Sequence, residues 1–286
     1  MTPALAVTPA LAALAAAALG GCAKFDLGDA ALVDGLRLLG VQAEPPEVLP
    51  GAPVELTAWV VDSHGGGVAV DWYACFLPSN GLANDGCTAA DRSGVVALGS
   101  GPAISMTAPA LDPTIAGPPD ATFGVFLPIV VHVTSSDGDT LEAIYRLRVR
   151  MTAPPGCPLA PPYPKNMHCE PNTNPAFSDI EPLGGDGPAV QAHAGQIWAL
   201  LAHYTADSDE EYRLPDGPEP VVPERLTTQW FATAGTFPDM PVGGTAVQKL
   251  TLDRELPPSG GTVDLWVVGH DDRGGTGMLH RQLVLQ

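Results

Sequence analysis

Residues 130–140 read VVHVTSSDGDT and residues 266–276 read WVVGHDDRGGT, and the two stretches align without a gap. In each, apolar residues lead into a turn rich in Asp and Gly, and a second alternating run follows. Alternation with a period of two is typical of half-buried β-strands, and Asp and Gly favour tight turns. Two copies of one β-unit explain this internal repeat better than a single large barrel does.

A second pair of matching stretches supports the repeat. Residues 70–74 read VDWYA and residues 228–232 read TQWFA, each with a Trp at its centre. A longer alternating run over residues 141–151 places apolar side chains on one face. Its opposite face carries Arg146, Arg148 and Arg150, so we expect a strand with a solvated, basic outer face.

Length and composition favour a β-rich protein of two domains. The chain has 286 residues, which is enough for two domains of about 100–200 residues each. It contains 32 Gly and 31 Pro, and both residues disfavour long helices. Hydrophobic residues make up 45% of the chain, so a packed core is expected instead of general disorder.

The charge of the chain excludes one class of partner. The net charge is −19, which repels the phosphate backbone of nucleic acids, so we predict no nucleic-acid binding. The excess of acidic residues indicates solubility, or alternatively an affinity for divalent cations.

The N-terminal apolar run predicts export and attachment to a membrane. Residues 9–19, PALAALAAAAL, are too few to span a bilayer, which needs about 20 apolar residues. They suit the hydrophobic region of a signal peptide. Leu19-Gly20-Gly21-Cys22 resembles the bacterial lipobox, although no Lys or Arg precedes the apolar run. The resemblance implies cleavage before Cys22 and a lipid on its thiol, and Ala23 suggests the outer membrane. Alternatively, the run is an ordinary signal peptide.

The number of cysteines agrees with a lipid on Cys22. The chain has five cysteines, and an unpaired thiol in an exported protein needs an explanation. Without Cys22, four remain as two pairs twelve positions apart, so we predict the disulfides Cys75–Cys87 and Cys157–Cys169. A zinc site made of Cys157, His168 and Cys169 is a weaker alternative because it lacks a fourth ligand.

These patterns divide the chain into five segments. We expect a signal peptide over residues 1–21 and a lipidated tether over residues 22–34. A first β-sandwich follows over residues 35–152. A Pro-rich linker containing a disulfide covers residues 153–175, and a second β-sandwich covers residues 176–286.

The chain also resembles a family of bacterial surface lipoproteins with tandem immunoglobulin-like or PKD-like sandwiches. The residues that carry the resemblance are residues 43–47 (AEPPE) before Pro50-Gly51, the strands of Trp72 and Trp230, and residues 265–275. The resemblance implies an all-β fold of two tandem immunoglobulin-like β-sandwiches, and it implies no particular activity. Unlike antibody domains, the chain has no Cys pair on its expected second and sixth strands.

No catalytic motif is present in the sequence. The chain contains no Gly-x-Ser-x-Gly elbow, no His-Glu-x-x-His motif and no phosphate-binding loop. We therefore predict a protein that is not an enzyme and has no cofactor other than a candidate Ca²⁺ ion.

Two acidic clusters are candidate calcium ligands. In an immunoglobulin-like sandwich, the loop after the second strand and the loop after the sixth strand lie at the same end. Carboxylates from both loops could therefore supply the oxygen ligands that Ca²⁺ requires. The simpler alternative is that these residues stabilise turns, with Arg273 in a local ion pair. The candidate ligands are Asp207, Asp209, Glu210, Asp271 and Asp272.

These inferences predict a lipid-anchored binding or structural module of the cell envelope, attached to the outer membrane of a Gram-negative bacterium. Its partners would be the membrane, through the lipid, and a protein or carbohydrate ligand. Trp59 and Trp198 could form an exposed aromatic platform for such a ligand. The alternative function is an accessory subunit of a secreted hydrolase or of an envelope export complex.

Overall fold

Strands account for almost all of the regular structure. The computed structural model describes residues 31–76, 87, 95–112, 124–153, 156–165, 168–183, 191–192, 197–208, 210–214, 221–237, 247–251 and 261–285. The predicted signal peptide and Cys22 lie outside these residues. Among the residues that are described, no helix has the length and apolar character needed to cross a membrane.

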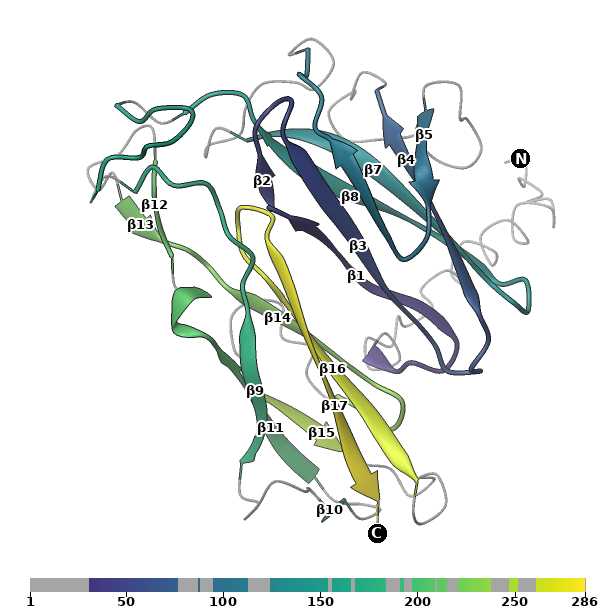
Figure 1. Cartoon of the computed structure of the whole chain (residues 1–286). Coiled ribbons are helices and arrows are strands. Elements are labelled where there is room, and N and C mark those ends of the chain that lie inside the picture. The colour runs from purple at the N-terminus through teal and green to yellow at the C-terminus, as the bar shows by residue number, and fades with distance from the viewer. Residues whose placement is uncertain are drawn as a thin grey trace, which may run out of the picture.

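The first β-sandwich consists of two sheets (Figure 1). One sheet has the order β1–β3–β6 and the other has the order β2–β8–β7–β4–β5. All neighbouring strands are antiparallel except β2 and β8, which are parallel. The strands are β1 (Leu36–Glu44), β2 (Glu47–Val48), β3 (Pro53–Asp62), β4 (Val68–Cys75), β5 (Val95–Ser100), β6 (Ala103–Thr107), β7 (Gly124–Ser135) and β8 (Thr140–Arg150).

The second β-sandwich repeats this order, except that its described strands include no counterpart of β5. One sheet has the order β15–β11–β9 and the other has the order β10–β17–β16–β14, with β10 parallel to β17. A 3-10 helix, η3, and the hairpin β12–β13 lie between β11 and β14. The elements are β9 (Phe177–Leu183), β10 (Gln191–Ala192), β11 (Ile197–Tyr204), η3 (Ala206–Ser208), β12 (Glu211–Arg213), β13 (Val221–Pro223), β14 (Thr227–Ala232), β15 (Val247–Thr251), β16 (Thr262–His270) and β17 (Thr276–Leu285).

The internal repeat falls on equivalent elements of the two sandwiches. Residues 130–140 lie in the hairpin β7–β8, and residues 266–276 lie in the hairpin β16–β17. Trp72 on β4 and Trp230 on β14 are both buried, each in the core of its own sandwich. The predicted all-β fold of two sandwiches is therefore confirmed.

Both predicted disulfides are present. Cys75 and Cys87 are bonded with their Cα atoms 5.6 Å apart, and the Cα atoms of Cys157 and Cys169 are 5.4 Å apart. The second disulfide occupies both cysteines that the zinc alternative required, so that alternative is wrong. The bond closes the linker between the sandwiches into a loop.

The expected basic outer face of β8 is wrong over its second half. Arg148 and Arg150 are only 1% and 3% exposed, whereas Arg146 is exposed. The reason is that further segments cover this face of the strand: Glu47 lies beside Arg148, and Cys169 and Tyr163 of the linker lie beside Arg150. Periodicity identified the face correctly but could not show what covers it.

The segment just before β1 is packed against both sandwiches. Ala31 is buried in the core of the second sandwich, and Val33 is buried between the two sandwiches. The Val33 amide donates a hydrogen bond of 2.8 Å to the Ala232 carbonyl at the edge strand β14. The last residues of the expected tether are therefore part of the folded body, because they are apolar and bury their side chains.

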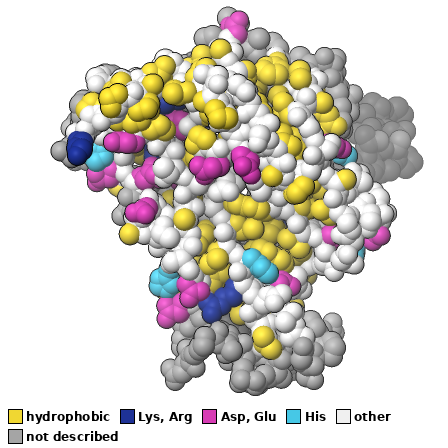
Figure 2. Space-filling view, in the orientation of Figure 1, with side chains coloured by type: hydrophobic (Ala, Val, Ile, Leu, Met, Phe, Trp, Pro, Cys, Tyr) yellow, Lys and Arg dark blue, Asp and Glu magenta, His cyan; other side chains and the backbone are white. Residues whose placement is uncertain are grey.

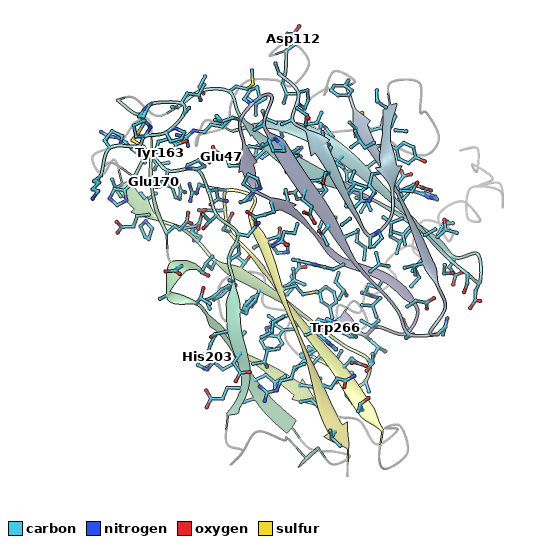
Figure 3. All side chains as sticks on the ribbon, in the orientation of Figure 1. Glu47, Asp112, Tyr163, Glu170, His203 and Trp266 are labelled. Atoms are coloured by element: carbon cyan, nitrogen blue, oxygen red, sulfur yellow. A yellow bond between two sulfur atoms is a disulfide. The ribbon has the colours of Figure 1, made fainter. Side chains whose placement is uncertain are left out.

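The two sandwiches share an apolar interface. It consists of buried residues and of partly buried residues packed against them: Val33, Leu39, Trp59, Val61, Phe231, Trp266, Val268 and Met278. Figure 2 shows hydrophobic side chains gathered where the upper and lower bodies meet, and Figure 3 labels Trp266. Trp59 therefore packs in this interface and does not form part of an exposed platform. The side chain of Trp198 lies outside the described part of the chain.

Candidate functional site at the junction of the sandwiches

The turn between β16 and β17 is shaped by its own aspartate. One carboxylate oxygen of Asp271, Oδ1, accepts hydrogen bonds from the amides of Arg273 (2.9 Å) and Gly275 (2.7 Å). Gly274 has a φ of 98°, a backbone conformation that residues other than Gly rarely adopt. The sequence Asp-Asp-Arg-Gly-Gly therefore fixes this turn and directs Arg273 towards the interior.

Arg273 is the centre of a buried ionic cluster. Its side chain is 6% exposed, and its Nε donates a hydrogen bond of 2.8 Å to Glu224. Its Nη2 pairs with Glu210, and its guanidinium lies 4.9 Å from the centre of the Tyr212 ring. Two carboxylates and an aromatic face thus surround one cation, which compensates for most of the cost of burying it.

Two asparagines of the linker connect the sandwiches. The Asn172 amide donates to Glu47 of the first sandwich (2.9 Å), and its side chain donates to Asp271 of the second (3.0 Å). The Asn174 side chain donates to the Ala43 carbonyl (2.7 Å) and accepts from the Thr276 amide (2.8 Å). The junction is therefore held by directional bonds as well as by apolar contact. The sequence analysis missed this role, although residues 171–175 (PNTNP) carry the signal of ordered turns.

The predicted calcium ligands are engaged in other interactions. Asp271 accepts three hydrogen bonds, Glu210 pairs with Arg273, and Asp272 accepts a hydrogen bond of 3.1 Å from the Tyr212 hydroxyl. Asp207 is exposed on η3, and Asp209 lies outside the described residues. No group of three His, Cys, Asp or Glu side chains suited to a metal occurs among the residues that the structure covers. These residues give the calcium site no support, and it stays a prediction.

Burial shifts the pKa of two groups at the junction in opposite directions. Burial raises the pKa of Glu224 from 4.5 to about 7, although Arg273 opposes the shift. Burial also lowers the pKa of His270 below its ordinary value, and the nearby Asp271 opposes this shift. Relative to the unfolded chain, folding therefore shifts Glu224 towards its protonated form and His270 towards its neutral form.

We expect the Glu224 pKa to be visible in the pH dependence of stability. Because the folded-state pKa lies above the unfolded-state value, unfolding between pH 4.5 and 7 releases a proton from this group. The contribution of Glu224 to the free energy of unfolding is complete below pH 4.5. This contribution is lost as the pH rises through 7, and the loss is on the order of 2 kcal/mol. Urea unfolding at pH 5 and pH 8 would measure this loss, and the substitution Glu224→Gln should abolish it.

His270 changes the free energy of unfolding in the opposite direction. Because its pKa is lower in the folded state, its protonation as the pH falls favours the unfolded chain. The difference between the wild type and Glu224→Gln isolates Glu224 from His270. An identical pH dependence in both proteins would contradict the raised pKa of Glu224.

A groove lies beside this cluster, between the first sandwich and the β16–β17 turn. Its volume is about 460 Å³, within the range of small-ligand sites. Its apolar wall comes from β1, β7 and β8, and its polar wall comes from the turn. Lining residues include Leu38, Phe126, Ile144, Tyr145, Arg146 and His270.

The strand order and the junction together define a protein of two immunoglobulin-like β-sandwiches. No known protein family matches the sequence, and comparison with curated proteins gives no match either.

Two solved structures are among those to which the chain is similar. The three N-terminal domains of the bacteriophage RB49 highly immunogenic outer capsid protein (Hoc) have a TM-score of 0.25 and 10% identity, with 88% of this chain and 59% of that one covered. The four N-terminal Ig domains of Dscam1 isoform 1.9 have a TM-score of 0.22 and 12% identity, with 84% and 43% covered. The chain thus spans about half the length of these structures. The strand order alone defines the architecture of this chain.

Proposed function

We propose that this protein is a lipid-anchored, non-catalytic binding module of the bacterial cell envelope, of the kind formed by surface lipoproteins with tandem immunoglobulin-like or PKD-like domains. The observation that carries the binding role is the groove of about 460 Å³ at the junction. Ligand sites occur preferentially at domain interfaces and combine apolar walls with a few polar groups. The lipobox-like residues 19–22 support the anchor.

The junction gives this groove a stable shape. Its two walls come from different sandwiches, so a ligand would meet a formed site only if the sandwiches hold one relative position. The apolar interface and the bonds of Asn172 and Asn174 maintain that position. A preorganised site loses less free energy in ordering when it binds.

The anchor is tested by the substitution Cys22→Ser in the full chain. We expect the wild type to fractionate with membranes and to begin with a lipid-modified Cys22 by mass spectrometry, because two or more acyl chains bind stably to a bilayer. Cys22→Ser should lose the lipid and remain uncleaved or become soluble. An unmodified Cys22 in the mature wild type would refute the anchor while leaving the groove untested.

The binding role is tested by capture from detergent-solubilised envelopes. Ile144→Glu places a charge in the groove, and Val96→Glu, at a position 53% exposed in the first sandwich, is its matched control. A protein or carbohydrate that Val96→Glu retains and Ile144→Glu loses would support the groove as the binding site. Recovery of a fixed enzyme or export complex by all three proteins would instead favour the accessory-subunit alternative.

A further inference from the structure

A small cavity beside the ionic cluster is lined by arginines from both sandwiches. Its volume is about 20 Å³, which is room for one water-sized particle. Arg148 and Arg150 reach it from β8, Arg213 from β12, and Arg273 from the β16–β17 turn. Glu47 and Glu170 also line it, and Figure 3 labels both residues together with Tyr163 at this end of the molecule.

Two of the four arginines already have carboxylate partners. Arg148 Nε lies 3.5 Å from Glu47, and Arg273 is paired with Glu210 and Glu224. Glu47 also accepts a hydrogen bond from the Asn172 amide. These carboxylates are therefore engaged with the two arginines and with the linker.

Arg150 has no such partner, although it is 3% exposed. Its Nη2 donates 2.7 Å to the Cys169 carbonyl, and its guanidinium lies 5.5 Å from the centre of the Tyr163 ring. Its buried Nη1 has no hydrogen-bond acceptor among the described residues. A carbonyl and a ring face are neutral, so neither contact supplies a counter-charge. Burying a charge without a counter-charge is strongly unfavourable.

Arg213 provides a second guanidinium without a carboxylate partner. No ion pair joins it or Arg150 to a carboxylate in the described ranges, whereas His168 on the same wall lies 3.7 Å from Glu211. Arg150 belongs to the first sandwich and Arg213 to the second. One anion in the cavity would therefore neutralise a cation from each.

We propose that this cavity binds one halide ion, chloride under physiological conditions, between Arg150 and Arg213. A monatomic anion suits the volume of about 20 Å³, which has room for about one water-sized particle. The attraction is local, because the chain as a whole carries a net charge of −19. The junction would therefore hold an anion, whereas the sequence analysis predicted a cation, Ca²⁺, at this end of the second sandwich.

Thermal unfolding of the purified full chain tests the proposal. The melting temperature is measured in sodium chloride and in sodium gluconate at equal ionic strength. We expect it to be about 2–4 °C higher in chloride, because a ligand that binds only the folded state raises stability. Arg150→Gln should lose this difference, and Arg225→Gln, which removes an exposed charge away from the cavity and the groove, should keep it. Equal melting temperatures of the wild type in the two salts would overturn the proposal.

A direct measurement keeps the test decisive if Arg150→Gln fails to fold. Crystals of the wild type grown in sodium bromide should show an anomalous scattering peak in the cavity, within hydrogen-bonding distance of Arg150 Nη1. A water molecule there, or the Glu170 carboxylate turned onto Arg150, would overturn the halide site. Neither the melting experiment nor the bromide crystals test the Cys22 anchor or the groove, so the halide site can fail without affecting either proposal.

Discussion

Replacement of Arg273 by Met should lower the free energy of unfolding by about 3–5 kcal/mol, because it leaves two buried carboxylates without their cation. Glu224 is almost fully buried beside Arg273, and Glu210 is mostly buried. Methionine preserves much of the volume of the side chain, so the loss reports charge and hydrogen bonds more than packing. Urea unfolding at pH 8 measures it. We expect a smaller loss at pH 5, where Glu224 is protonated in the folded state.

The matched control is Arg281→Met in the same sandwich. Arg281 forms an ion pair of 2.5 Å with Asp179, whose side chain is 61% exposed. Arg281 itself is 24% exposed and also donates to the Ile180 carbonyl, but its partner carboxylate faces solvent. Exposed pairs contribute about 0–1 kcal/mol, so the control should lose much less stability than Arg273→Met. Equal losses in the two variants would show that the cluster around Arg273 is no stronger than a surface ion pair.

Replacement of Trp72 by Ala should destabilise the first sandwich by about 3–5 kcal/mol. Trp72 is 0% exposed and packs in the core, so its removal leaves a large cavity. The substitution also removes the hydrogen bond of 2.8 Å that the indole donates to the Gly101 carbonyl. Trp72→Phe should cost less, since it keeps an aromatic ring in the core. Chemical denaturation followed by far-UV circular dichroism measures both losses.

Val96→Ala is the control for core truncation. Val96 lies on the neighbouring strand β5 and is 53% exposed, so its truncation should change stability by less than about 0.5 kcal/mol. A loss of under about 1 kcal/mol for Trp72→Ala would mean that the core closes around the missing side chain.

The sequence predicted those parts of the fold that depend on local pattern. Alternation over residues 141–151 located the strand around Leu147, whose side chain is buried. The spacing of the cysteines predicted both disulfides. These signals are local because each strand face and each short loop is read from neighbouring residues.

The burial of Arg148 and Arg150 could not be predicted in this way. Polar residues on the outer face of a strand normally face water, and here the packing of β2, the linker and the second sandwich covers them. The same holds for Trp59, which was considered for an exposed platform and which packs at the interface with the other sandwich.

The ionic cluster was missed for a related reason. Asp271 was recognised as a turn residue or a metal ligand, and its two bonds to Arg273 and Gly275 agree with the turn. Arg273, however, finds its partners 49 and 63 residues away in the sequence. No spacing rule relates Arg273 to Glu224 and Glu210, because they meet only after the second sandwich has folded.

The docking of Ala31 and Val33 determines where a mechanical load would enter the protein. In sequence, the first sandwich follows Cys22 directly, but in space the chain reaches the second sandwich first, at the edge of β14. The chain from Cys22 to Ala31 extends no more than roughly 30 Å. A force between the proposed anchor at Cys22 and a ligand would therefore act first on the Val33–Ala232 hydrogen bond and on the packing of Ala31 in the second core. The covalent connection from Val33 to β1 would carry the full force only after this contact had broken.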